Sequence, residues 1–108
     1  MSTHLPTLFD IEAAAEVVYR SFAPTPQYRW ALLSERLGTD CWVKHENHTP
    51  VGAFKIRGGL TYFDQLARSG TLPREAISAT RGNHGQSIGW AARAHGVACT
   101  IVVPHGNS

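Results

Sequence analysis

The sequence predicts an α/β fold with an open, mostly parallel sheet whose strands are joined by helical crossovers. First, segments with strand and helix character alternate over residues 41–103. Second, the apolar run at residues 100–103 is rich in β-branched residues, which suits a strand covered on both faces. Third, strands separated by helices pair in parallel through right-handed crossovers. We therefore expect a βαβαβ unit in the second part of the chain.

The first predicted element is a helix over residues 8–19. Thr7 can cap the free amides of its first turn, and Asp10 suits the positive end of the helix dipole. Apolar residues recur at steps of three and four and predict one buried face: Leu8, Ile11, Ala15, Val18 and Phe22. The polar residues between them are expected to face solvent: Glu12, Glu16 and Arg20.

Pro24 and Pro26 break the chain after this helix, because neither has a backbone N–H to donate. A short helix over residues 31–37 follows and ends at Gly38. We expect residues 1–38 to form an N-terminal helical segment.

Residues 39–108 are expected to form the βαβαβ part, which carries the binding loops. The pattern predicts strands over residues 41–45, 76–79 and 97–103, and helices over residues 54–68 and 84–95. The sequence stops soon after the third strand, before any helix that could cover it. We expect an incomplete domain, truncated at its C-terminus.

Composition narrows the classes of function. The 108 residues are 43% hydrophobic, enough for one ordinary core. The net charge of +2 is not concentrated in any run, so a nucleic-acid partner is not indicated. The N-terminus lacks the pattern of a secretory leader, and no stretch approaches the ~20 apolar residues of a membrane span. Cys41 and Cys99 lie in apolar segments, as reduced thiols do, so we expect a cytoplasmic protein without a membrane partner.

Two segments that lead into helices contain the residue types of a ligand site. Ligands of open parallel sheets bind beyond the carboxyl ends of the strands. One segment places Lys55 in the first turn of a helix, behind Gly52, which allows a sharp turn. The other contains Gly82 and Gly85, which allow close backbone approach, and the free amides of the helix that follows can bind an anion. Taken singly, the two segments also fit a solvated lysine and an ordinary glycine-rich turn.

A metal site is not favoured by the histidines. His45 and His48 flank Glu46 and lie near Cys41, but they lack the His-Glu-x-x-His spacing of two ligands on one helix. No further pair of ligands follows them. We therefore expect no metal.

Taken together, the two segments resemble a known family. Gly-Ala-Phe-Lys-Ile-Arg-Gly at residues 52–58 and Gly-Asn-His-Gly-Gln at residues 82–86 are similar to motifs of the pyridoxal-phosphate-dependent fold-type-II enzymes, specifically the threonine/serine dehydratase (threonine ammonia-lyase) group. The resemblance extends over residues 24–108. It implies pyridoxal 5'-phosphate as cofactor. For the intact protein it implies a homo-oligomeric lyase of amino-acid metabolism that removes water and then ammonia from a small hydroxy amino acid, giving a 2-oxo acid.

The resemblance also implies roles for individual residues. Lys55 would form the Schiff base with the cofactor and later move the α-proton. Phe54 would pack on a face of the cofactor ring, and Asn83 would hydrogen-bond its phenolic oxygen. The substrate carboxylate would be held largely by backbone amides of one loop: Thr80, Arg81, Gly82, Asn83 and His84.

Three positions discriminate among branches of this family. Ile56 and His84 favour dehydratases over the related threonine and cysteine synthases, which usually carry aspartate and threonine there. Arg81 stands where racemases have a serine that transfers a proton, and a guanidinium does not deprotonate. Three other positions depart from the threonine, serine and serine that are common in the family: Val51, Ala53 and Thr80.

Other interpretations remain open. Within the family, the intact protein could be a racemase or another hydroxy-amino-acid lyase. Outside it, the chain could be a non-catalytic α/β anion-binding module or the remnant of a truncated gene. The resemblance implies that the family's glycine-rich phosphate loop lies later in the enzyme and that this chain corresponds to roughly the first third of it. We therefore expect the 108-residue chain by itself to be inactive.

Overall fold

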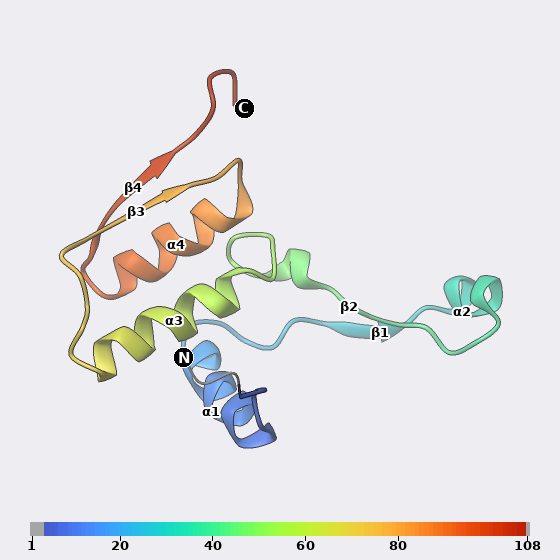
Figure 1. Ribbon diagram of the computed structural model, residues 1–108. Coiled ribbons are helices and arrows are strands. Elements are labelled where there is room, and N and C mark those ends of the chain that lie inside the picture. The colour runs from blue at the N-terminus through green and yellow to red at the C-terminus, as the bar shows by residue number, and fades with distance from the viewer. Residues whose placement is uncertain (1–3, 108) are drawn as a thin grey trace.

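A computed structural model describes residues 4–107, which form an α/β fold (Figure 1). The helices α1, α2, α3 and α4 and the strands β1, β2, β3 and β4 follow one another in the order α1 (Leu8–Tyr19), β1 (Gln27–Arg29), α2 (Ala31–Leu37), β2 (Trp42–Lys44), α3 (Ile56–Arg68), β3 (Glu75–Ala79), α4 (Asn83–Ala94) and β4 (Ala98–Val102). A 3-10 turn over Glu46–His48 lies between β2 and α3.

The second half of the chain is layered. β3 and β4 pair in parallel, with Ile77 opposite Thr100, and α4 forms the crossover between them. Figure 1 shows α4 and α3 stacked on one side of this pair, with α1 beyond α3. The predicted α/β class with a helical crossover is confirmed for β3, α4 and β4.

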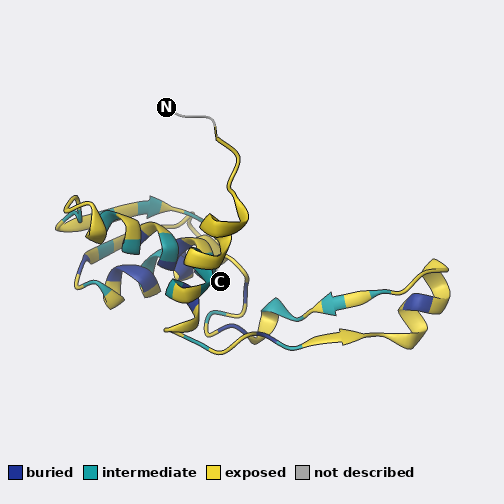
Figure 2. Cartoon of the chain, turned by 90° about the horizontal axis from the view of Figure 1, so that it is seen from below, coloured by how far each residue is buried: buried dark blue, intermediate teal, exposed yellow. Residues whose placement is uncertain are grey.

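The core lies where α3 crosses α4. Helix α3 is strongly amphipathic, and its apolar residues recur on the face turned to α4. The buried cluster consists of Ile56, Leu60, Phe63, Ala91, Ala92 and Val97. Figure 2 shows the buried residues concentrated in these packed helices.

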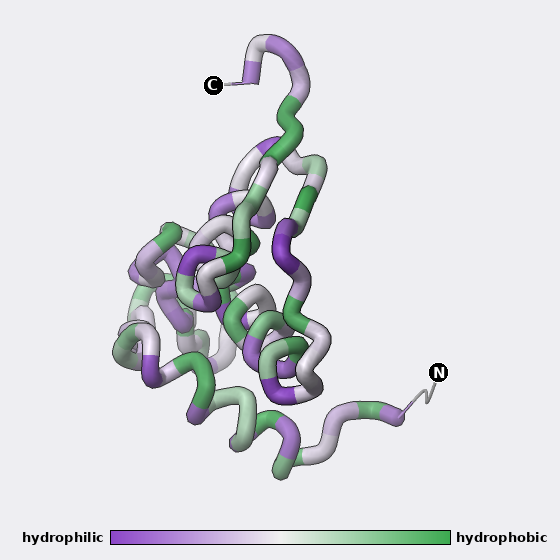
Figure 3. Tube along the Cα trace, turned by 90° about the vertical axis from the view of Figure 1, so that its left-hand side faces the viewer, coloured by the Kyte–Doolittle hydropathy of each residue, from purple (hydrophilic) through white to green (hydrophobic). Residues whose placement is uncertain are grey.

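Helix α1 begins as its sequence predicts. The Asp10 amide donates to the Thr7 hydroxyl at 3.2 Å, and the Asp10 carboxylate accepts from the Thr7 amide at 2.8 Å, which completes a capping box. Its predicted buried face is only partly buried. Val18 is buried, whereas Leu8 and Ile11 near the start of the helix are 70% and 58% exposed. Figure 3 shows hydrophobic residues recurring along this helix, yet only its end packs closely against the rest of the chain.

The remaining elements form an arm, which we define as residues 27–44. β1 and β2 pair antiparallel, with Tyr28 opposite Val43, and α2 lies at the far end. Figures 1 and 2 show this arm projecting from the helices with most of its residues exposed. The strand predicted at residues 41–45 therefore exists, but the expectation that it joins the parallel sheet is wrong.

The reason is β1, a strand that the sequence pattern did not predict. Pro24 and Pro26 precede this strand and do not interrupt it, so its backbone remains free to pair. The ladder extends beyond the assigned strands, because the His45 amide donates to the Pro26 carbonyl at 2.8 Å. β1 and β2, which are joined by the short helix α2, therefore pair with each other, and β2 does not join the parallel pair of β3 and β4.

None of the helices in residues 4–107 combines the length and the apolar character that crossing a bilayer requires. Cys41 and Cys99 are both free thiols and half-buried.

Candidate active site

The loop between β2 and α3 is folded by its own side chains. The Thr49 hydroxyl, which is buried, donates to the Ala53 carbonyl at 2.7 Å and accepts from the Ala53 amide at 2.9 Å. Gly52 has a φ of 71°, so the predicted sharp turn at this glycine is confirmed. Lys55 is the residue immediately before α3, whereas we expected it in the first helical turn. The turn at residues 51–55 delays the start of the helix by two residues relative to the predicted Phe54.

A polar cluster lies beside Lys55 and joins three segments of the chain. Arg57 donates to the two carboxylate oxygens of Glu46 at 2.6 Å and 3.0 Å, and the Thr25 hydroxyl donates to the same carboxylate. The Arg57 guanidinium holds the pKa of Glu46 at about 2, well below its ordinary value of 4.5. The guanidinium also lies over the rings of Tyr19 and Phe22, 5.7 Å and 5.3 Å from their centroids. The cluster thus fixes the first turn of α3.

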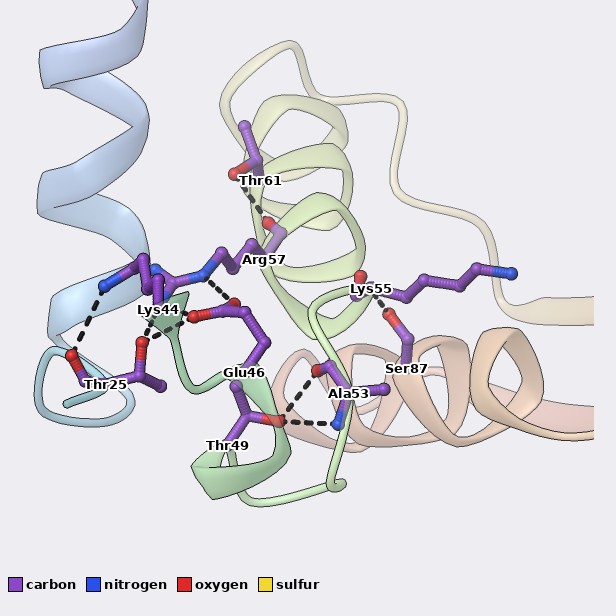
Figure 4. A network of polar contacts seen from close by, with 9 residues as sticks. All are labelled: Thr25, Lys44, Glu46, Thr49, Ala53, Lys55, Arg57, Thr61 and Ser87. Carbon is purple, nitrogen blue, oxygen red and sulfur yellow. Dashed lines mark hydrogen bonds and ion pairs between the residues drawn. The ribbon is translucent and has the colours of Figure 1, made fainter. Parts of the chain in front are cut away.

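Lys55 itself is exposed, and its side chain extends away from this cluster (Figure 4). Within residues 4–107 its amine forms no ion pair. Its backbone carbonyl accepts a hydrogen bond from the Ser87 hydroxyl of α4 at 2.7 Å. The backbone of Lys55 is therefore held, while its amine is exposed and has no ion-pair partner among residues 4–107.

A cavity of about 680 Å³ lies next to this lysine. Phe54 and Lys55 line it from one side, and His84 and Ser87 line it from α4. Apolar residues of α3 and β3 form most of the remaining wall, and the Phe54 ring is 62% exposed. The volume lies within the range of small-molecule sites, roughly 300–1,000 Å³. An exposed aromatic ring beside a free amine can hold a flat, aldehyde-bearing ligand.

The loop between β3 and α4 follows the carboxyl end of a parallel strand, as predicted. Thr80, Arg81 and Gly82 line a second hollow of about 350 Å³, and Asn83 is not among the residues lining either space. The Gly82 amide donates to the Thr80 hydroxyl at 3.2 Å, and the Gln86 amide donates to the Gly82 carbonyl at 3.3 Å. The amides of residues 83–85 therefore precede the first helical hydrogen bond of α4, which leaves them suited to an anion.

The two glycines of this loop have different roles in packing. A Cβ on Gly85 would overlap the side chains of Thr80 and Ile101, so the missing side chain of Gly85 makes room for packing within the chain itself. A Cβ on Gly82 would meet no heavy atom within 4 Å, so the described residues impose no such demand on it.

The structure thus divides the predicted site residues between two spaces. Phe54, Lys55 and His84 line one cavity, and Thr80 to Gly82 line the other. Neither Ser87 nor the Glu46–Arg57 pair was predicted from the sequence. A serine within an otherwise apolar helix face was the available signal for Ser87, but its partner lies 32 residues away in the sequence.

Comparison with known proteins adds three findings. A family model described as pyridoxal-phosphate dependent enzyme matches residues 18–108. The mitochondrial threonine dehydratase of Schizosaccharomyces pombe is 37% identical over 87 residues, which cover 81% of this chain and 14% of that protein. The serine racemase of Dictyostelium discoideum is 31% identical over 98 residues, which cover 91% of this chain and 30% of that protein.

Solved structures agree with these relatives. The crystal structure of a threonine deaminase superposes with a TM-score of 0.76 at 31% identity, covering 92% of this chain and 32% of that chain. The present chain therefore spans about a third or less of the length of these proteins.

Proposed function

The chain belongs to the family of pyridoxal-phosphate dependent enzymes, and on that premise we propose that it supplies the lysine-bearing part of a lyase. The substrate would be a small β-hydroxy amino acid, threonine or serine, which loses water by β-elimination. The enamine that is released would tautomerise to an imine, and hydrolysis of the imine would take up one water and release ammonia, leaving a 2-oxo acid. One observation carries the proposal. The amine of Lys55, without an ion-pair partner in residues 4–107, lines the same cavity as Phe54 and His84.

The residues of this cavity fit the ring and the aldehyde end of the cofactor. Phe54 offers an exposed aromatic face, and Lys55 offers an amine for covalent attachment. When bound, pyridoxal phosphate supplies an electron sink for the charge that develops on the substrate α-carbon. Lys55 would hold the cofactor through its Nζ and afterwards move the α-proton as acid and base. Asn83, at the start of α4 and outside the lining of this cavity, would hydrogen-bond the phenolic oxygen of the cofactor.

The loop from Thr80 to His84 would hold the substrate carboxylate. The amides at the start of α4 carry the positive end of the helix dipole, and this loop leads directly into them. The Thr80 hydroxyl accepts from the Gly82 amide and so shapes the loop. Arg81 would add charge without providing the main contact.

Arg81 favours a lyase over a racemase. Racemisation needs a second group that removes or returns a proton on the opposite face, and a guanidinium does not deprotonate. A serine racemase and threonine dehydratases match this chain at similar identity, so an assay of products must decide the reaction.

The proposal also covers the division of the chain into parts and the assembly of the intact enzyme. We assign the cofactor- and substrate-binding part to residues 39–108 and an N-terminal segment to residues 1–38. The intact enzyme would be a cytoplasmic homo-oligomer.

The lysine assignment can be tested on the 108-residue chain by borohydride reduction in excess pyridoxal phosphate. The sequence has two lysines, so Lys44 is an internal control. The Lys44 amine donates to the Thr25 carbonyl at 3.4 Å and lies near Glu46. Peptide mass spectrometry should find the reduced cofactor on Lys55 in clear excess over Lys44. Equal labelling of both lysines would contradict the assignment.

The reaction can be tested on the longest natural reading frame that contains these residues. Threonine should give 2-oxobutanoate, and Lys55→Ala should abolish turnover while the far-UV circular dichroism is unchanged. Arg81→Ala should lower the rate only mildly, because backbone amides carry the carboxylate contact. If the enzyme converted L-serine to D-serine and formed no pyruvate, it would be a racemase and the proposed lyase activity would be wrong.

A further inference from the structure

Helices α3 and α4 approach each other unusually closely at Gly59. A Cβ built on Gly59 would overlap the Ser87 hydroxyl and would lie 3.0 Å from the Ser87 carbonyl oxygen. Both residues are buried. The absence of a side chain at residue 59 therefore makes room for the hydroxyl at residue 87.

The Ser87 hydroxyl uses this room to bond across the helix interface. Ser87 is only 1% exposed, and its Oγ donates to the Lys55 carbonyl at 2.7 Å (Figure 4). The same carbonyl accepts the Gly59 amide at 3.2 Å, as the first hydrogen bond of α3. The backbone of Lys55 is thus held from its own helix and from α4.

This partner is not the one that a buried helical hydroxyl usually finds. Serine and threonine within helices commonly bond the carbonyl four residues earlier in the same helix. Thr61 of α3 does so, donating to the Arg57 carbonyl at 2.8 Å. Ser87 bonds the residue before α3 instead. Since Ser87 is one turn after Asn83, its hydrogen bond links the lysine loop to the start of α4.

We infer that Ser87 is a positioning residue whose hydroxyl fixes the Lys55 backbone relative to the start of α4, in a gap that Gly59 keeps open. The catalytic meaning of this anchor rests on the proposed function, because that proposal assigns Lys55 as the covalent lysine. The anchor itself is a property of the helix pair and can be measured without the cofactor.

Ser87→Ala removes the hydroxyl and keeps a good helix former in the gap. Amide hydrogen exchange of residues 55–59 in the 108-residue chain should accelerate about threefold to tenfold, the effect of one ordinary hydrogen bond. The ratio of borohydride-trapped cofactor on Lys55 to that on Lys44 should fall by a similar factor. Thr61→Ala is the matched control, since it removes a hydroxyl-to-carbonyl bond from the same helix, and both measurements should remain at the original values.

A second pair of variants separates the hydroxyl from the packing. Gly59→Ala should strongly destabilise the chain, and adding Ser87→Gly should restore part of the melting temperature, because it removes the overlap with the hydroxyl while the close approach to the backbone carbonyl of residue 87 remains. The double variant still lacks the hydroxyl, so its labelling ratio should stay as low as that of Ser87→Ala. Recovery of the original ratio in the double variant would show that packing positions the lysine, and would overturn the inference.

The outcomes distinguish this inference from the proposed function. If the original chain labels Lys55 and Lys44 equally, the proposed function fails, and hydrogen exchange at residues 55–59 alone decides whether Ser87 is an anchor. If the original chain prefers Lys55 and Ser87→Ala leaves that preference and the exchange rates unchanged, the anchor is wrong and the proposed function stands.

Discussion

The arm and the packed helices hold their shapes by different means. In the helices, Phe63 and Ile56 are almost completely buried at the crossing of α3 and α4. In the arm, Leu32 is 81% exposed and Trp42 is 60% exposed. Apolar burial, the main stabilising contribution in folded proteins, is therefore concentrated in the helices. The candidate site therefore lies in the packed helical region, where apolar packing holds its residues in place.

The arm depends on backbone and side-chain hydrogen bonds instead. At its tip the Ser34 hydroxyl donates to the Trp30 carbonyl at 2.8 Å and accepts from the Cys41 amide at 2.9 Å. Gly38, with a φ of 68°, ends α2 and returns the chain toward β2. These hydrogen bonds define the shape of the arm, but they bury little apolar surface.

The largest expected difference between the two regions comes from truncating one apolar side chain in each. Phe63→Ala leaves a cavity in the core and should cost about 3–5 kcal/mol of unfolding free energy. Leu32→Ala removes a solvated side chain and should change it by less than about 0.5 kcal/mol. Urea unfolding followed by circular dichroism measures both. A large loss in Leu32→Ala would show that the arm buries this leucine in solution, for example against another copy of the chain.

A smaller change in unfolding free energy is expected where the arm joins the helices. There Glu46, which follows the arm, pairs with Arg57 of α3. The pKa of Glu46 is lowered from 4.5 to about 2, so its stabilising contribution is present above pH 4.5 and is lost as the pH falls through about 2. The shift corresponds to on the order of 1–3 kcal/mol after allowance for partial solvent screening of the pair.

Glu46→Gln tests this contribution, because the amide does not titrate. The original chain should be more stable than the variant at pH 6, and the two should converge as the pH approaches 2. The midpoints of urea unfolding at several pH values give the comparison. A constant difference across this range would mean that the carboxylate is not ionised in the pair.

The same two regions show which elements could be predicted from the sequence and which could not. The residue ranges of α1 and α2 were predicted correctly, because Thr7 with Asp10 and Gly38 are local signals for helix ends. β1 was missed because three exposed residues between proline and a helix carry no hydrophobic periodicity. The partner of β2 depended on this missed strand, so its pairing could not be predicted.

The candidate site shows the same limit. Lys55, Phe54 and His84 could be found from local motifs, and the structure brings them to one cavity. The hydrogen bond of Ser87 could not, since it depends on how closely α3 and α4 cross. Local signals identify candidate site residues, whereas the contacts that hold those residues are set by tertiary packing.

The smallest expected changes in unfolding free energy concern the ion pairs, which differ between the two regions in their exposure to solvent. In the arm, Arg29 and Asp40 lie 2.7 Å apart with side chains 44% and 68% exposed. In the helical region, Asp64 pairs with Arg20, the residue that directly follows α1, at 3.1 Å and with Arg68 at 2.6 Å, and its side chain is only 18% exposed. Exposed pairs contribute about 0–1 kcal/mol, because solvent screens them and ordering two side chains costs entropy.

Asp40→Asn should therefore change the unfolding free energy by less than about 0.5 kcal/mol. Asp64→Asn should cost more, because this carboxylate pairs with two arginines and thereby connects α3 to the end of α1. Urea midpoints in 50 mM and 500 mM salt should show a larger and less salt-sensitive loss for Asp64→Asn, since its carboxylate is the less solvated one. If Asp40→Asn cost as much as Asp64→Asn and were equally resistant to salt, the arm would be shielded from solvent. The contrast between a solvated arm and a packed helical region would then no longer hold.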